Sequence, residues 1–235
     1  MSRLVSLGRW IAGTILFMIS FFILALSLTF LDRKQTFAYA RSLFSIVIRI
    51  MGIQLMVQGK DRIVRGQTYL IMGNHQSLFD LFVIPAAIPL VFTGVEAAYH
   101  FSIPVWGYLI RKWGCIPIRR QSLAQAKQSL EIARQTLEGG LSIAVLPEGH
   151  RTRTGKMAPF KKGPFHLAHA TKATILPFGI QGLFEFQQRG GFLIRPGRVW
   201  VRIGTPMDYD DYGRLSVEAL RDEVFSRVQG LSGQA

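Results

Sequence analysis

The sequence has little cysteine and few acidic residues, and both scarcities restrict what the protein can be. A single cysteine, Cys115, in 235 residues excludes a disulfide framework and any zinc site built from several cysteines. Only 14 Asp and Glu residues oppose 28 Lys and Arg, which gives a formal net charge of +14. This excess indicates an anionic partner, either nucleic acid or an anionic membrane. A disordered chain is also excluded, because 49% of the residues are hydrophobic.

The chain length and the distribution of charge favour one domain beside a membrane. A chain of 235 residues has room for one substantial domain and a short additional segment. Residues 1–207 hold 25 basic against 8 acidic residues, whereas residues 208–235 carry the other six acids. Because the basic part begins with a very apolar N-terminus, we expect anionic membrane lipid, and no nucleic acid, as the partner.

The longest hydrophobic segment runs from Trp10 to Leu31 without a charged residue. A membrane-spanning helix needs about 20 apolar residues, so this segment is long enough to be one. The alternative is a cleaved signal peptide, since Arg3 and Arg9 precede the segment. The apolar core of a signal peptide is only about 7–15 residues long, and an uncleaved membrane helix is therefore our prediction.

A second apolar stretch covers residues 37–57, after the polar residues 32–35. Arg41 and Arg49 are spaced to fall near one helix face, a pattern typical of an amphipathic helix at a membrane surface. We therefore expect residues 1–57 to form a membrane-embedded helical hairpin and residues 58–235 to form the main domain. The alternative is a single membrane span followed by a core helix.

From Gly59 onward, short apolar runs alternate with amphipathic stretches. Five runs predict strands, at residues 69–72, 115–118, 142–146, 174–178 and 199–203. Residues 122–138 predict a helix, because leucines and alanines recur at helical spacing between a capping box at Ser122 and the pair Gly139-Gly140. A last helix is expected from about Ser216. The sequence thus predicts an α/β fold, a mixed sheet flanked by helices, with the helical hairpin at its N-terminus.

The first motif with chemical potential is the pair His75 and Asp80, which directly follows the predicted strand 69–72. In a tight strand-to-helix turn, the aspartate can hold one imidazole nitrogen and leave the other to act as a general base. The alternative is a structural role, with Asp80 as a helix cap and His75 as a turn residue.

A second motif, Pro-Glu-Gly-His-Arg-Thr at residues 147–152, follows the predicted strand 142–146. Gly149 permits a tight turn, and the planar guanidinium of Arg151 suits a phosphate group. Five basic residues and no acidic residue occur in residues 151–162. A solvated basic loop is the alternative, but α/β folds bind ligands at strand ends. A third and weaker feature is the strand 115–118, which ends in Arg119 and Arg120.

Other catalytic and metal-binding patterns are missing from the sequence. It contains no Gly-x-Ser-x-Gly, no Walker A sequence and no Gly-x-Gly-x-x-Gly. His166 and His169 are three residues apart on a predicted helix, without a nearby carboxylate to complete the three or four ligands of a zinc site. His100 is interpreted as a packing or surface residue. We therefore expect neither a metal nor a cofactor.

Together, the motifs resemble those of the glycerolipid acyltransferase family. Their order and spacing match over about residues 55–205, in the His-x4-Asp motif, the Pro-Glu-Gly-x-Arg motif, the following Phe-Lys-x-Gly, the arginine of the middle motif and the late apolar-proline block (His75, Asp80, Pro147, Glu148, Gly149, Arg151, Phe160, Lys161, Gly163, Arg120 and residues 175–177). Two residues depart from the family pattern. His150 replaces the usual threonine, and Arg119 replaces the aspartate that usually precedes the middle arginine.

The resemblance implies an acyltransferase that moves a fatty acyl group from acyl-CoA or acyl-carrier protein to the free hydroxyl of a lysophospholipid. The favoured acceptor is 1-acyl-sn-glycerol 3-phosphate, which would give phosphatidic acid in phospholipid biosynthesis. His75 is then the general base and Asp80 its orienting partner. The residues expected to bind substrate are Asn74, Arg120, Glu148, Gly149, Arg151 and Lys161. Residues 58–235 would be the catalytic domain, facing the cytosol at a bacterial cytoplasmic membrane.

Other functions remain open at this point. The two departures lie in acceptor-contacting motifs, so the acceptor could be another lysolipid, such as a lyso-aminolipid. A lipid-ester hydrolase would use His75 and Asp80 to activate water. A membrane-tethered protein that binds anionic lipid or nucleic acid, without chemistry, would need neither residue.

Overall fold

One seven-stranded sheet forms the centre of the protein. The computed structural model describes residues 3–118 and 123–233, and the strand order in the sheet is β1-β7-β6-β2-β5-β3-β4. The strands are β1 (Ile53–Gln58), β2 (Tyr69–Gly73), β3 (Phe92–Ala97), β4 (Ile116–Ile118), β5 (Ser142–Val145), β6 (Thr174–Gln181) and β7 (Gly197–Ile203). All neighbouring strands are parallel except β6 and β7, which are antiparallel. The predicted α/β fold with a mixed sheet is thereby confirmed.

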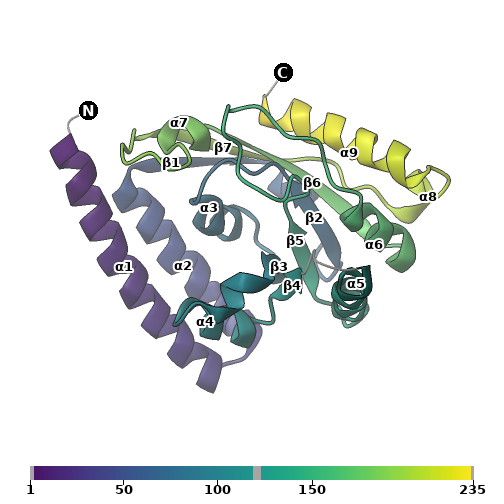
Figure 1. Cartoon of the computed structure of the whole chain (residues 1–235), viewed down its shortest axis with the longest axis horizontal. Helices are drawn as coiled ribbons and strands as arrows, with labels where there is room; N and C mark the ends of the chain where they lie inside the picture. Colours follow the sequence, from purple (N-terminus) through teal and green to yellow (C-terminus); the bar gives the residue numbers. More distant parts are fainter. Residues whose placement is uncertain (1–2, 119–122, 234–235) are drawn as a thin grey trace.

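Helices cover both faces of the sheet (Figure 1). They are α1 (Arg3–Phe30), α2 (Arg33–Met51), α3 (Asp80–Ala87), α4 (Trp106–Trp113), α5 (Leu123–Glu138), α6 (Gly163–Thr171), α7 (Leu183–Phe186), α8 (Tyr209–Tyr212) and α9 (Val217–Ser232). One hydrophobic cluster joins α2 and α3 to the sheet, and a second joins α5, α6, α8 and α9 to its other face. Two short 3-10 helices, η1 (Lys60–Arg62) and η2 (Ala98–Ser102), lie in the connections.

The central strand β2 and its two neighbours end at the same end of the sheet. All five of its residues are buried, as expected for a strand covered on both faces, and this explains its continuous apolar sequence. Its neighbours β5 and β6 both run parallel to it. The loops that follow β2, β5 and β6 therefore lie together at the carboxyl ends of these strands, where α/β folds bind ligands.

The α1 and α2 helices form an antiparallel pair at the N-terminus. The Arg9 side chain near the start of α1 donates to the carbonyl oxygens of Ile50 and Met51 at the end of α2. Among the described residues, α1 is the one helix long and apolar enough to cross a membrane by length and composition. Only 28% of the residues in its most apolar 18-residue stretch are buried inside the protein. Large apolar side chains such as Ile15 and Phe22 are exposed along it.

The second apolar stretch of the sequence is not one helix, and its predicted extent to residue 57 was wrong. The α2 helix ends at Met51, because Gly52 adopts the left-handed conformation (φ +96°) and its N–H donates to carbonyls of the last turn. The next six residues form β1, which pairs with β7 along its whole length. Buried residues of α2, including Val47 and Ile48, share one cluster with the sheet.

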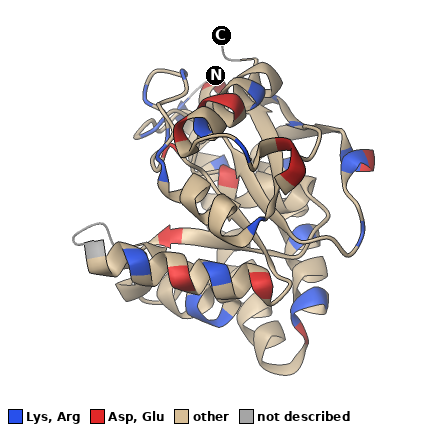
Figure 2. Cartoon of the chain, turned by 90° about the vertical axis from the view of Figure 1, so that its right-hand side faces the viewer, with Lys and Arg blue, Asp and Glu red and all other residues tan. Residues whose placement is uncertain are grey.

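The five predicted strands are present, as are the helices predicted within residues 122–138, around His166 and from about Ser216, and a helix follows the turn at Asp80; β3 and α4 were not predicted. The α9 helix begins after Ser216, whose hydroxyl accepts from the Ala219 N–H as an N-cap. The predicted cap of α5 at Ser122 lies outside the described residues. Along α5, Arg134 pairs with Glu131 and Glu138, so that acidic and basic residues alternate on this surface (Figure 2). The basic and acidic residues of α5 balance each other, so the excess positive charge of the protein does not lie on this helix.

Candidate active site

The turn from β2 into α3 carries the predicted catalytic pair. Asp80 is the first residue of α3, and its side chain folds back over the turn that precedes the helix. One carboxylate oxygen, Oδ2, accepts from the backbone N–H of Gln76 at 2.9 Å and of Ser77 at 3.2 Å. The aspartate thus closes the turn on itself, and this closure brings a residue five positions earlier within reach.

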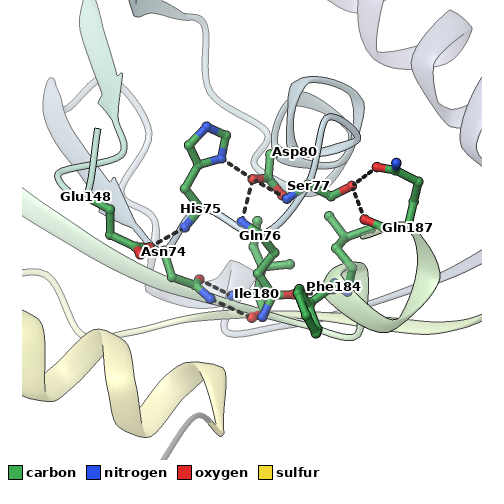
Figure 3. A network of polar contacts seen from close by, with 10 residues as sticks. Asn74, His75, Gln76, Ser77, Asp80, Glu148, Ile180, Phe184 and Gln187 are labelled. Atoms are coloured by element: carbon green, nitrogen blue, oxygen red, sulfur yellow. Dashed lines mark hydrogen bonds and ion pairs between the residues drawn. The ribbon is translucent and has the colours of Figure 1, made fainter. Parts of the chain in front are cut away.

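The residue that the turn brings beside Asp80 is His75. Its Nδ1 lies 2.5 Å from Asp80 Oδ2, and the Asp80 side chain is 3% exposed while that of His75 is 24% exposed (Figure 3). Because a carboxylate can only accept, Nδ1 carries the proton and the lone pair of the neutral ring is on Nε2. Both residues line a cavity. The arrangement is that of a general base with an orienting carboxylate.

Glu148 holds this turn from the side of β5. Its Oε1 accepts from the His75 N–H and its Oε2 from the Ala158 N–H, each at 2.7 Å. The Thr152 N–H also donates to the His75 carbonyl oxygen at 2.9 Å. Burial raises the pKa of Glu148, and the hydrogen bonds from the Ala158 and His75 N–H groups oppose this rise. Glu148 is 1% exposed, and through these bonds it positions His75; its predicted part in substrate binding stays a prediction.

Asn74, another of the residues predicted to bind substrate, lies inside the protein. Its side chain is completely buried, with Nδ2 donating to the Ile180 carbonyl oxygen at 2.9 Å and Oδ1 accepting from the Ile180 N–H at 2.7 Å. This pair of bonds ties the end of β2 to β6 (Figure 3). The amide is thus used inside the protein, one residue before His75.

The remaining predicted substrate residues are Gly149, Arg151, Lys161 and Arg120. Gly149 adopts a left-handed conformation (φ +73°), which a glycine tolerates best, and it lines the cavity with Arg151. Lys161 is exposed and does not line that cavity; its backbone N–H donates to Pro147 O at 2.9 Å. Arg120 lies outside the described residues. The structure therefore brings Gly149 and Arg151 together with His75 and Asp80.

The cavity beside His75 has a volume of about 790 Å³, within the range of ligand sites. Most of its wall is apolar and comes from α1, α2, α3 and α4, with Phe17, Phe44 and Phe82 in aromatic contact. Its polar part comes from the loops at the carboxyl ends of the strands, where His75 and Arg151 lie. A ligand with a long apolar portion and a polar end matches this lining.

Sequence reasoning missed three residues with acidic, basic or imidazole side chains at the cavity, namely Glu96, His100 and Arg189. His100, which was interpreted as a packing or surface residue, lines it and pairs with Glu96, with Nδ1 to Oε2 at 2.5 Å. Arg189 lines it from the loop after α7. A histidine and a glutamate four residues apart gave a local signal for the first pair. No motif indicated Arg189, because the loop that carries it reaches the site only through the fold.

The single thiol is not a suitable nucleophile. Cys115 lines the cavity, and burial raises the pKa of its thiol to about 11. Because the thiolate is the reactive form, Cys115 is unreactive at neutral pH. No group of three or more His, Cys, Asp or Glu side chains that could hold a metal ion occurs among the described residues.

These observations define an α/β protein with a histidine–aspartate pair at the end of a central strand, beside a large apolar cavity. Comparison with known proteins gives the family. The family model described as Acyltransferase matches residues 54–181, and the chain belongs to this acyltransferase family. The resemblance inferred from the motifs is thereby confirmed.

Individual relatives agree with the family. The chain is 33% identical over 156 residues to a 1-acyl-sn-glycerol-3-phosphate acyltransferase of Limnanthes douglasii, covering 66% of this chain and 54% of that one. It is 30% identical over 163 residues to 1-acyl-sn-glycerol-3-phosphate acyltransferase alpha of Mus musculus, covering 66% and 55%. The chain thus spans about half the length of these relatives.

A solved structure shows the same fold over nearly the whole chain. The crystal structure of the 1-acyl-sn-glycerophosphate acyltransferase PlsC from Thermotoga maritima superposes with a TM-score of 0.83 at 22% identity. The match covers 98% of this chain and 97% of that one. The two-helix N-terminal part is therefore included in the shared fold.

The position of Glu148 leads to a prediction about stability. In Glu148→Gln, one of the two backbone N–H groups would face an amide NH2 in place of an oxygen. A buried donor left unsatisfied costs about 1–3 kcal/mol, which for a chain of this size lowers Tm by several degrees. Thermal unfolding followed by circular dichroism measures this loss.

The matched control is Glu131→Gln, because Glu131 is an exposed acid paired with Arg134 on α5. Breaking an exposed ion pair changes stability by about 1 kcal/mol or less. A Glu148→Gln protein with an unchanged Tm and a weakened affinity for substrate would instead place Glu148 in the binding site.

Proposed function

We propose that the protein transfers a fatty acyl group from an acyl thioester, acyl-CoA or acyl-carrier protein, to the free hydroxyl of a lysophospholipid. The observation that carries the proposal is the His75–Asp80 pair at the polar part of an apolar cavity of about 790 Å³. The names of the relatives support 1-acyl-sn-glycerol 3-phosphate as the acceptor and phosphatidic acid as the product. The reaction would serve phospholipid biosynthesis.

In this mechanism, His75 activates the acceptor directly. A glycerol hydroxyl is a poor nucleophile at neutral pH, and a positioned base contributes about 10²–10⁴-fold. Nε2 of His75 takes the hydroxyl proton as the oxygen attacks the thioester carbonyl. The new C–O ester bond forms, the C–S bond breaks, and the departing thiolate takes the proton from the imidazolium. Asp80 stabilises the imidazolium through Nδ1–H, and no acyl-enzyme forms.

The oxyanion that develops at the thioester carbonyl needs N–H donors. The backbone N–H groups of His75, Gln76 and Ser77 already bind carboxylates. Those of His150 and Arg151 make no hydrogen bond within the described residues, and both residues line the cavity. We assign these two N–H groups to the oxyanion. The Arg151 side chain, from the same loop, would hold the acceptor phosphate.

The N-terminal helices give the enzyme its access to lipid. We propose that α1 and α2 embed in the membrane, with the catalytic domain facing the cytosol at a bacterial cytoplasmic membrane. The exposed apolar side of α1 supports this, because such a surface is costly in water. Residues of both helices also line the cavity beside His75. An acyl chain could then pass from the bilayer into the cavity along a continuous apolar surface.

The product of the reaction tests the proposed function. The full-length protein is given a radiolabelled acyl donor, acyl-CoA or acyl-carrier protein, with each of several lysolipids or with no acceptor. We expect the label in phosphatidic acid, formed about 10-fold faster or more than any other product, because buried polar contacts discriminate head groups. Label in free fatty acid would identify a hydrolase, and label in an acylated aminolipid would identify the alternative acceptor. Unaltered donor in every reaction would contradict the proposal.

Washing of membranes tests the proposed location. The full-length protein should stay with membranes in carbonate or in about 1 M salt, where surface attraction is screened within about 3 Å. Ile15→Glu with Phe22→Glu should release it, since a charge at the bilayer centre costs about 2.5–3.5 kcal/mol. Met56→Glu, on an exposed apolar residue of β1, is the control and should stay bound. Release of the unmodified protein would contradict membrane insertion.

A further inference from the structure

The loop of residues 187–196, between α7 and β7, is fixed to the catalytic turn by a buried glutamine. The Ser77 hydroxyl donates toward both the carbonyl oxygen and the side-chain Oε1 of Gln187, each at 3.1 Å (Figure 3). Nε2 of Gln187 donates to Gln188 O at 2.6 Å and to Gly191 O at 2.8 Å. Ser77 is completely buried and Gln187 is 4% exposed. The start of this loop is thus held two residues from His75.

Arg189 occupies the tip of a tight turn in this loop. The Gly191 N–H donates to Gln188 O at 2.9 Å, and Gly190 adopts a positive φ of 77°. Further along, Trp10 Nε1 of α1 donates to Phe192 O at 2.7 Å. Both ends of the turn are therefore anchored, and the arginine between them projects from a constrained backbone. Such constraint reduces the entropy lost when a side chain binds a ligand.

Arg189 lines the same cavity as His75 and Arg151. It forms no ion pair with a carboxylate among the residues that the structure describes. Its loop follows β6 and α7, whereas Arg151 follows β5, and these two strands flank β2 in the sheet. Two guanidinium groups that form no ion pair within the described part of the chain, those of Arg151 and Arg189, thus lie on separate loops at the cavity that also contains His75.

We infer that Arg189 is a second phosphate-binding residue, which holds a phosphate of one of the two substrates. The inference rests on the proposed acyl transfer, in which the acceptor carries a phosphate at its head group and the donor carries one on its phosphopantetheine arm. A guanidinium binds phosphate through two charge-assisted hydrogen bonds, a strong and directional contact. Gln187 acts as a positioning residue, because it fixes the turn that presents the arginine.

Steady-state kinetics with Arg189→Ala tests the inference. The full-length protein is used in neutral detergent, so that attraction to an anionic bilayer does not contribute, and both substrates are varied. A phosphate is the same in the ground state and the transition state, so its loss weakens binding in both. We expect the KM of one substrate to rise about 10-fold or more, with kcat changed by less than about 3-fold.

The substrate whose KM rises identifies the phosphate. A higher acceptor KM places Arg189 on the lysolipid head group, and a higher donor KM places it on the phosphopantetheine arm. Arg151→Ala, measured in parallel, is the reference for the acceptor phosphate. Arg189→Lys should recover only part of the lost affinity, because a point charge cannot reproduce the two-pronged contact. Either KM result, with partial recovery, supports the inference.

Arg195→Ala is the matched control, because Arg195 is an exposed arginine of the same loop that does not line this cavity. It should leave both KM values unchanged. If Arg189→Ala behaves like Arg195→Ala in an active protein, the inference is overturned and Arg189 is only a surface charge. If the unmodified protein transfers no acyl group, the proposed function fails first, and the inference falls with it.

Discussion

The site depends on one constraint, the turn of residues 73–80, in which the backbone N–H groups of residues 75–77 are satisfied by two buried carboxylates. Asp80 accepts from the N–H groups of Gln76 and Ser77, and Glu148 accepts from that of His75. A buried N–H without a partner is costly, so the two acids define how the turn is built. The same closure puts the His75 ring beside Asp80. The hydrogen bonds that fold the turn are therefore also those that set the geometry of His75 and Asp80, the proposed catalytic pair.

The two carboxylates have different functions in spite of their proximity. Asp80 bonds to the imidazole as well as to the backbone, so it acts on the proposed base itself. Glu148 bonds to the backbone on both sides, and it joins the β2 loop to the loop after β5. Movement of Glu148 would therefore shift the histidine relative to Gly149 and Arg151. This linkage explains why a glutamate with little exposure occurs among residues that face the cavity.

The N-terminal helices pack with the sheet and belong to the same folded unit. Buried residues of α2 belong to the same cluster as the sheet, and residues of α1 pack against it. The α1 and α2 helices supply the apolar wall next to His75. The part of the chain proposed to enter the membrane is thus the part that would receive the acyl chain. This removes the need for a separate path between the bilayer and the site.

The sequence predicted the features that local patterns determine. Continuous apolar runs marked β2 and β5, because strands buried on both faces need them. The spacing of His75 and Asp80 was a weak signal by itself, but it allowed the two side chains to meet in a tight turn. It could not predict β1, whose six residues extend an apolar stretch that looks helical until Gly52 ends it.

Contacts between residues far apart in the chain were also beyond prediction. Asn74 meets Ile180 and Ser77 meets Gln187, more than 100 positions away in each case. The roles of Asn74, Glu148 and Arg189 follow from such contacts, and single motifs do not contain them.

The proposed mechanism requires that His75, oriented by Asp80, is the base of direct acyl transfer. The turnover number of His75→Ala, measured on folded full-length protein beside His166→Ala, tests it most directly, because His166 is an exposed histidine on α6 away from the cavity. We expect a kcat about 10²-fold or more below that of the control, with the acceptor KM nearly unchanged. Asp80→Asn should lower kcat as well, because Nδ1–H then loses its carboxylate acceptor. A His75→Ala protein with the kcat of the control would exclude His75 as the base.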